Sequence, residues 1–296
     1  MSSKAKKVLL KFGVSALLFG VIFAKVDKKI LLETLKMVDL RYAPLIVLFL
    51  VLNYVVSSIR WKKLLIHENT SHITVKYLTG LYFMGSFFNN FMPTSIGGDV
   101  FKVVKLGKKM GSTTDAFSAT FMERFTGVIA LVLISSASMI HLLGFLGLII
   151  FVGFWVAVAV GFSSLKLVSK KVKFVNKIYD SLLEYKGHKK VIVIAFMTSF
   201  AVQLLTIFTQ YFIFVSLGVR PPLFYSLFIF PVIILASFFI PSLNGVGVQD
   251  SLYIKLFVVV GVAEPLALSA SVLFHLFRLG VSLVGGVLYA VDRNQV

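Results

Sequence analysis

The feature that most constrains the fold of this chain is a series of long apolar runs, separated by short segments rich in Lys and Arg. Several runs reach the roughly 20 residues that an α-helix needs to cross a bilayer. The mean hydropathy is +0.94 and only 14% of residues are charged, whereas soluble chains carry about 25% charged residues. In hydrocarbon, only helices and closed barrels satisfy every backbone polar group. The sequence therefore predicts an all-α, polytopic membrane helix bundle.

We expect about eight spanning segments. They cover residues 8–24, 42–65, 73–91, 116–143, 144–165, 191–217, 223–240 and 266–291. The basic start of the chain has no small-residue cleavage site after it, which favours an uncleaved first helix. Residues 28–39 place their apolar side chains on one face, which predicts a helix lying along the membrane interface. No soluble domain is visible, so residues 1–296 form one predicted membrane domain, with halves at about 1–165 and about 166–296.

The basic residues predict the orientation of the bundle. Most Lys and Arg fall in loops that share one side when the N-terminus is placed in the cytoplasm. Such loops stay inside and face anionic headgroups, so we expect the inner (plasma) membrane with both termini cytoplasmic. The same loops account for the formal net charge of +18 without nucleic acid, for which no motif is present. The sequence has no Cys and no His, Asp or Glu cluster with metal-ligand spacing, so no metal or cofactor is expected.

Two of the predicted spans are interrupted by short segments rich in Pro and Gly. The first reads PTSIGGD from Pro93 to Asp99, and the second reads PSLNGVGVQD from Pro241 to Asp250. Each begins with Pro and a hydroxyl residue, has Gly four positions later, and soon reaches an Asp. Paired interruptions in the two halves of a membrane protein indicate an inverted repeat around a midplane site. We therefore predict two re-entrant hairpins, 89–110 and 238–262, that form an inverted pseudo-repeat and enter from opposite faces.

Non-helical backbone at bilayer depth requires a polar cavity, because each unpaired N–H or C=O group costs several kcal/mol in hydrocarbon. The hairpin backbone residues expected at such a cavity are Pro93, Gly97, Gly98, Pro241, Gly245 and Gly247. A helix that starts after these glycines presents free N–H groups and a positive dipole end, which suit an anion such as phosphate. The alternative is that Pro and Gly merely kink two helices and that the two Asp residues cap them.

Charged and polar side chains within the apolar segments are the candidates for lining this cavity. A charge near the bilayer centre costs at least about 2.5–3.5 kcal/mol, so it usually faces a cavity and a partner. The candidate set, whose charges nearly cancel, is Asp99, Glu123, Arg124, Asn244, Asp250 and Arg278. Structural ion pairing between helices is the alternative for each residue. Arg60 is predicted to be a loop-facing anchor beside Trp61, and His275 to be a packing residue.

Two lysines follow the first interruption. Lys102 and Lys105 lie three and six positions after Asp99, near one face of the short helix that leaves the hairpin. They are candidates for a funnel that attracts lipid phosphates. A solvated, positive-inside loop explains them equally well.

The ordered set of these motifs resembles the lysylphosphatidylglycerol synthase transmembrane-region family, whose members are often called flippase-like domains. The resemblance rests on NFMPTSIGGD at 90–99, on Glu123-Arg124 within a helix and on PSLNGVG at 241–247, and it covers essentially the whole chain. It implies a membrane bundle with re-entrant helices that moves lipids between leaflets. In relatives fused to an aminoacyl-transferase, the lipid is an aminoacylated phospholipid. Asp250 stands where many relatives have Glu, which preserves the charge.

No part of the sequence corresponds to that transferase domain, so lysyl-phosphatidylglycerol synthesis is not expected. The leading hypothesis is a flippase-like transporter, not an enzyme, for an anionic, aminoacylated or polyisoprenyl-phosphate-linked lipid. The expected partners are membrane lipids, and association of several copies is compatible with the sequence but not specified by it. A membrane-embedded, lipid-modifying transferase is the alternative. Against the transferase stand the lack of a Gly-rich phosphate loop and of a closely spaced acidic metal-binding pair.

Overall fold

The computed structural model describes residues 28–66, 70–90, 97–169, 173–240, 242 and 244–293. In these ranges every regular element is a helix, which confirms the predicted all-α membrane bundle. The α-helices are α2 (Lys28–Lys36), α3 (Ala43–Leu64), α4 (Val75–Asn89), α5 (Gly97–Met110), α6 (Thr113–Leu143), α7 (Phe145–Ser169), α8 (Lys173–Glu184), α9 (Lys189–Ser216), α10 (Leu223–Phe239), α11 (Val248–Phe257) and α12 (Glu264–Arg293). Two short 3₁₀ helices, η1 (Leu40–Tyr42) and η2 (Val258–Val260), complete them.

Four helices in the described ranges are long and apolar enough to cross a membrane. They correspond to residues 40–64, 113–143, 189–216 and 264–291. Parts of α7 and α10 are apolar but shorter. The predicted first span, 8–24, lies outside the described residues.

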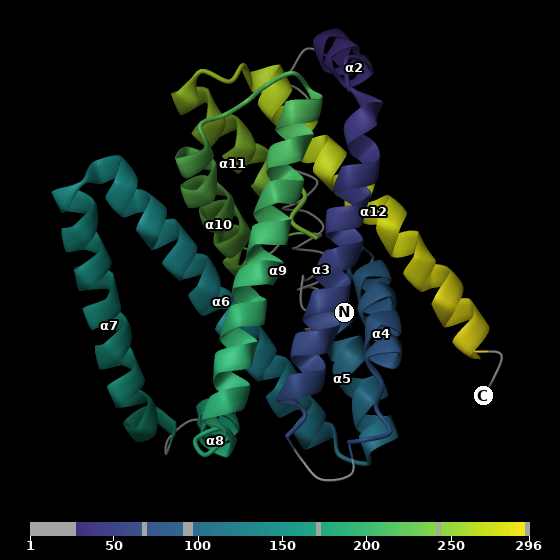
Figure 1. The fold of residues 1–296 in the computed structure, drawn as a ribbon, viewed down its shortest axis with the longest axis vertical. Helices are drawn as coiled ribbons and strands as arrows, with labels where there is room; N and C mark the ends of the chain where they lie inside the picture. Colours follow the sequence, from purple (N-terminus) through teal and green to yellow (C-terminus); the bar gives the residue numbers. More distant parts are fainter. Residues whose placement is uncertain are drawn as a thin grey trace, which may run out of the picture.

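Two helical hairpins enter the bundle from opposite ends (Figure 1). The first consists of α4 and α5, which pack against each other, and the second consists of α10 and α11. The ends of the two hairpins meet inside the bundle, because the side-chain amide of Asn244 donates a hydrogen bond of 2.8 Å to the amide oxygen of Asn90. Pro93 and Pro241 themselves lie outside the described residues.

The helix packing links the two halves of the chain in a reciprocal way. The long helices α3 and α9 pack along each other, α4 packs against α12, and α10 packs against α6. The first helix of each hairpin thus contacts a long helix of the other half. An inverted repeat gives this pattern, and the repeat itself stays a prediction.

Basic side chains gather at one end of the bundle. Helices α3 and α5 end there with the pairs Lys62-Lys63 and Lys108-Lys109, and α9 begins there with Lys189-Lys190 (Figure 1). The helix starts at this end use ordinary caps: the Thr74 hydroxyl accepts from the N–H of Tyr77, and Ser112 caps α6. This distribution is the one on which the predicted orientation depends.

Glycine allows two pairs of helices to approach closely. A Cβ at Gly98 of α5 would collide with the backbone carbonyl of Gly85 in α4. In α12, a Cβ at Gly285 would collide with the carbonyl of Phe83 in α4. Small residues at such crossings let the backbones of membrane helices pack closely. Both hairpin geometry and the position of α12 therefore depend on individual glycines.

Gly285→Ala is expected to destabilise the protein by about 1–3 kcal/mol, because the backbone of α4 must move to accept the methyl group. The measurement is the thermal unfolding midpoint of the purified chain in detergent. Gly280→Ala is the matched control on the same helix, since a Cβ there meets nothing within 4 Å. Equal midpoints for the two variants would contradict the proposed close contact between α12 and α4.

Candidate functional site: a charged cavity where the two hairpins meet

A cavity of about 290 Å³ lies between helices of both halves of the chain. Its walls come from α3, α4, α5, α6, α9, α10 and α12, and from the segment around the start of α11. The predicted residues Gly98, Asp99, Lys102, Glu123, Arg124, Asn244, Gly245 and Arg278 all line it. The structure therefore brings together, in one cavity, candidates that are up to 180 residues apart in the sequence.

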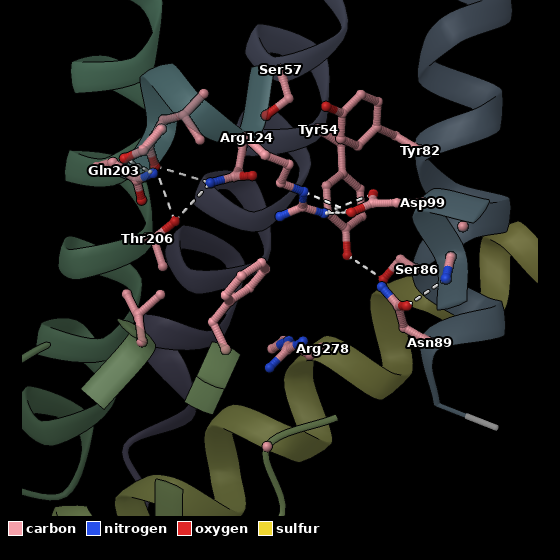
Figure 2. Close-up of a pocket in the computed structure, with 18 of the residues that line it drawn as sticks. Tyr54, Ser57, Tyr82, Ser86, Asn89, Asp99, Arg124, Gln203, Thr206 and Arg278 are labelled. Atoms are coloured by element: carbon pink, nitrogen blue, oxygen red, sulfur yellow. Dashed lines mark hydrogen bonds and ion pairs between the residues drawn. The ribbon is translucent and has the colours of Figure 1, made fainter. Parts of the chain in front are cut away.

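The first ionic cluster joins α5 to α6. The guanidinium of Arg124 donates two hydrogen bonds to the Asp99 carboxylate, from Nε to Oδ2 at 2.7 Å and from Nη2 to Oδ1 at 2.8 Å (Figure 2). Lys102 Nζ lies 3.0 Å from Asp99 Oδ1. Such a bidentate pair fixes the geometry of both side chains. Arg124 keeps 46% of its side chain exposed, whereas Asp99 is buried, so the cation faces the open space.

The second ionic cluster joins α3 to α6. Arg60 Nη2 donates to Glu123 Oε1 at 2.7 Å, and its Nη1 donates to the Ser199 hydroxyl at 2.8 Å. The Tyr82 hydroxyl also donates to Glu123 Oε1. Arg60 is only 4% exposed, so the prediction of a loop-facing anchor is wrong. A buried carboxylate 63 residues away holds Arg60 in the interior instead.

Lys102 connects the two ionic clusters. Its Nζ lies 3.9 Å from Glu123 Oε2 and 3.8 Å from the centroid of the Tyr82 ring. Only 3% of its side chain is exposed, so Lys102 belongs to the cavity wall and not to an exposed basic surface. Lys105, the other predicted funnel residue, does not line the cavity.

Arg278 enters the cavity from α12, apart from the Arg124–Asp99 pair (Figure 2). Its Nη2 donates a hydrogen bond of 2.6 Å to the Asn244 side-chain oxygen. Asn244 has a left-handed backbone (φ 49°) and also donates to Asn90, which in turn donates to Ser282 on α12 at 2.7 Å. Within the described ranges, no carboxylate lies within 4.0 Å of Arg278.

Asp250 lies beside the cavity rather than in its wall. Its Oδ2 accepts the N–H of Gly247 at 2.7 Å, which caps the start of α11. Its Oδ1 accepts from the Ser271 hydroxyl at 2.6 Å and lies 3.3 Å from His275 Nε2.

The start of α5 is capped in a similar way to that of α11: the N–H of Gly98 donates to the Asn89 side-chain oxygen at 2.7 Å. Because side chains of the protein cap both helix starts at these N–H groups, the side-chain cations are the better anion donors.

The cavity carries an excess of positive charge. Its charged lining side chains are four cations (Arg60, Lys102, Arg124, Arg278) and two anions (Asp99, Glu123), a formal excess of two positive charges. The nearly neutral set expected from the sequence changes because Arg60 and Lys102 join it and Asp250 does not line the cavity. Gly97 and Gly247 also lie outside the lining.

The structure adds polar lining residues that the sequence analysis missed. Asn53 of α3 donates to the Thr206 hydroxyl of α9 at 2.8 Å, Gln203 donates to the carbonyl of Gly127, and Tyr54 shares a hydrogen bond with Ser86. Their signal is a polar stripe in an apolar span: Asn53, Ser57 and Arg60 recur at helical spacing on α3. His, Asp and Glu of the described part of the chain form no group able to hold a metal ion.

In the part of the chain that the structure describes, an all-helical bundle with four helices of spanning length and buried charges around a cavity defines a multi-pass membrane protein. The family model described as "Lysylphosphatidylglycerol synthase TM region" matches residues 8–286, and the chain belongs to this family. It is also 23% identical to a Pyrococcus horikoshii protein described as "UPF0104 membrane protein PH1989". The alignment is 330 residues long and covers 98% of each chain. No solved structure matches the chain.

Proposed function

We propose that this protein is a flippase-like transporter that moves a lipid between the leaflets of the plasma membrane. The observation that carries the proposal is Arg278, a cation near the middle of a spanning helix that faces the cavity without a carboxylate partner among the described residues. An unpaired charge at such depth is costly unless an anion or water compensates it. A lipid phosphate entering the cavity supplies that anion.

The hairpins give this proposal its geometry. They enter from opposite ends and meet at Asn90 and Asn244, next to Arg278. In a bilayer they are re-entrant segments, with the polar cavity at the midplane and the basic end of the bundle in the cytoplasm. The headgroup crosses through the cavity while the acyl or isoprenoid chain stays in lipid. No catalytic group is assigned, and membrane lipids are the partners.

Arg278→Gln is expected to slow lipid translocation at least about tenfold, because the cavity loses the cation that compensates the phosphate. The full chain is reconstituted in vesicles that contain fluorescent phosphatidylglycerol, and the accessibility of the label to an external quencher is followed over time. Arg220→Gln is the matched control, since Arg220 is exposed and outside the cavity.

Equal rates for the two variants and the wild type would end the proposal that Arg278 contacts the lipid. If lipid translocation in vesicles that contain the wild-type protein is no faster than in protein-free vesicles, the transport proposal itself fails. Formation of a modified lipid from a labelled donor would instead favour a transferase.

A further inference from the structure

Both carboxylates that line the cavity are paired with the protein's own cations. Asp99 is held by both Arg124 and Lys102, and Glu123 Oε1 accepts from Arg60 and Tyr82. The other Glu123 oxygen, Oε2, is enclosed by the protein; it accepts no hydrogen bond and lies 3.9 Å from Lys102 Nζ. No carboxylate in the lining is therefore open to an ammonium group of a substrate.

The cations are in the opposite situation. A guanidinium has five N–H donors, and in the described structure Arg278 makes one hydrogen bond, to Asn244. That bond, together with the Phe274 ring 5.2 Å from the guanidinium carbon, fixes the direction in which Arg278 faces the cavity. Arg124, which also lines the cavity, leaves nearly half of its side chain exposed. Planar guanidinium groups held in this way match phosphate oxygens.

The remaining walls complete an amphiphilic site. The amide and hydroxyl side chains of Asn53, Gln203 and Thr206 line one wall and offer hydrogen bonds to hydroxyl groups. Ile234, Leu235 and Phe238 of α10 line another wall. A headgroup in the cavity therefore lies beside an apolar wall that suits the chain of the lipid.

Resting on the proposed function, we infer the substrate class: a lipid whose phosphate headgroup has net negative charge and carries no ammonium group. Hydroxylated phosphodiesters such as phosphatidylglycerol and isoprenoid-linked phosphates fit this description. An aminoacylated phospholipid does not, because its ammonium group enters a positively charged cavity with no accessible carboxylate. Juxtaposed like charges suppress wrong partners in this way.

The test compares two lipids that differ only in the aminoacyl group. Wild-type protein is reconstituted in phosphatidylcholine vesicles with fluorescent phosphatidylglycerol or fluorescent lysyl-phosphatidylglycerol, and the rate of quencher accessibility is measured for each. We expect phosphatidylglycerol to move at least about tenfold faster. Arg278→Glu places a free carboxylate in the cavity and is expected to reverse the preference. Lys255→Glu makes the same charge change on an exposed residue outside the lining and is expected to leave the preference unchanged.

The outcomes separate this inference from the proposed function. Equal wild-type rates for both lipids, or faster movement of the aminoacylated lipid, overturn the substrate class and leave lipid transport standing. Movement of neither lipid overturns both. A parallel arm with radiolabelled inorganic phosphate identifies the source of the phosphate group: uptake of this ion without movement of either lipid overturns the assignment to a lipid headgroup.

Discussion

Glu123→Gln is expected to lower the stability of the protein by about 3–5 kcal/mol, because it leaves the buried Arg60 guanidinium without its carboxylate. Lys102 loses a neighbouring negative charge at the same time. Gln has nearly the same shape as Glu, so the loss of stability comes from the missing charge and not from changed packing. The measurement is the thermal or denaturant unfolding midpoint of the chain in detergent.

Glu264→Gln is the matched control, since Glu264 is exposed in the first turn of α12 and makes no ion pair in the described structure. A second comparison isolates the pair itself. Arg60→Gln combined with Glu123→Gln removes both charges. The double variant should therefore lose less unfolding free energy than the two single variants lose together. Additive losses would show that Arg60 and Glu123 do not stabilise each other.

The second large effect concerns Asp99. Asp99→Asn releases Arg124, whose side chain already faces the cavity, and raises the formal excess in the lining to three positive charges. Binding of an anionic headgroup is expected to tighten about tenfold or more, since the headgroup no longer competes with the carboxylate for the guanidinium. Release of the headgroup from Arg124 slows for the same reason. Translocation should therefore slow although the affinity for the headgroup rises.

Affinity is measured by displacement of fluorescent phosphatidylglycerol from the purified chain, and translocation by the vesicle assay. Asp39→Asn is the control, because Asp39 pairs with Arg41 outside the cavity. The unfolding midpoint of each variant shows whether the fold is retained. Unchanged affinity in a folded Asp99→Asn protein would mean that Arg124 does not bind the headgroup.

The local sequence was enough to predict where the hairpin helices end. Proline removes a backbone donor and glycine weakens helices, so the breaks follow from neighbouring residues alone. In the structure α4 ends at Asn89 and α5 begins at Gly97, while α10 ends at Phe239 and α11 begins at Val248. Whether these hairpins are re-entrant in a bilayer stays a prediction.

The composition of the cavity depends on contacts that local sequence does not encode. Local sequence predicts a loop-facing Arg60 because Trp61 and two lysines follow it, yet its partner Glu123 comes from another helix. Asp250 follows a Pro- and Gly-rich interruption as Asp99 does, but it caps α11 and is covered by Ser271 and His275 of α12. Burial and pairing of this kind are decided by how distant helices pack.

The amide bridge between Asn90 and Asn244 has a mechanical consequence. Its two residues belong to hairpins that enter from opposite ends, and the same Asn244 side chain orients Arg278. A hydrogen bond is lost once the donor and acceptor separate by more than about 0.5 Å beyond their normal distance. Displacement of either hairpin alone therefore breaks this bridge, and displacement of the second hairpin against α12 also frees Arg278 from Asn244, so the positions of the two hairpins and of the arginine are coupled.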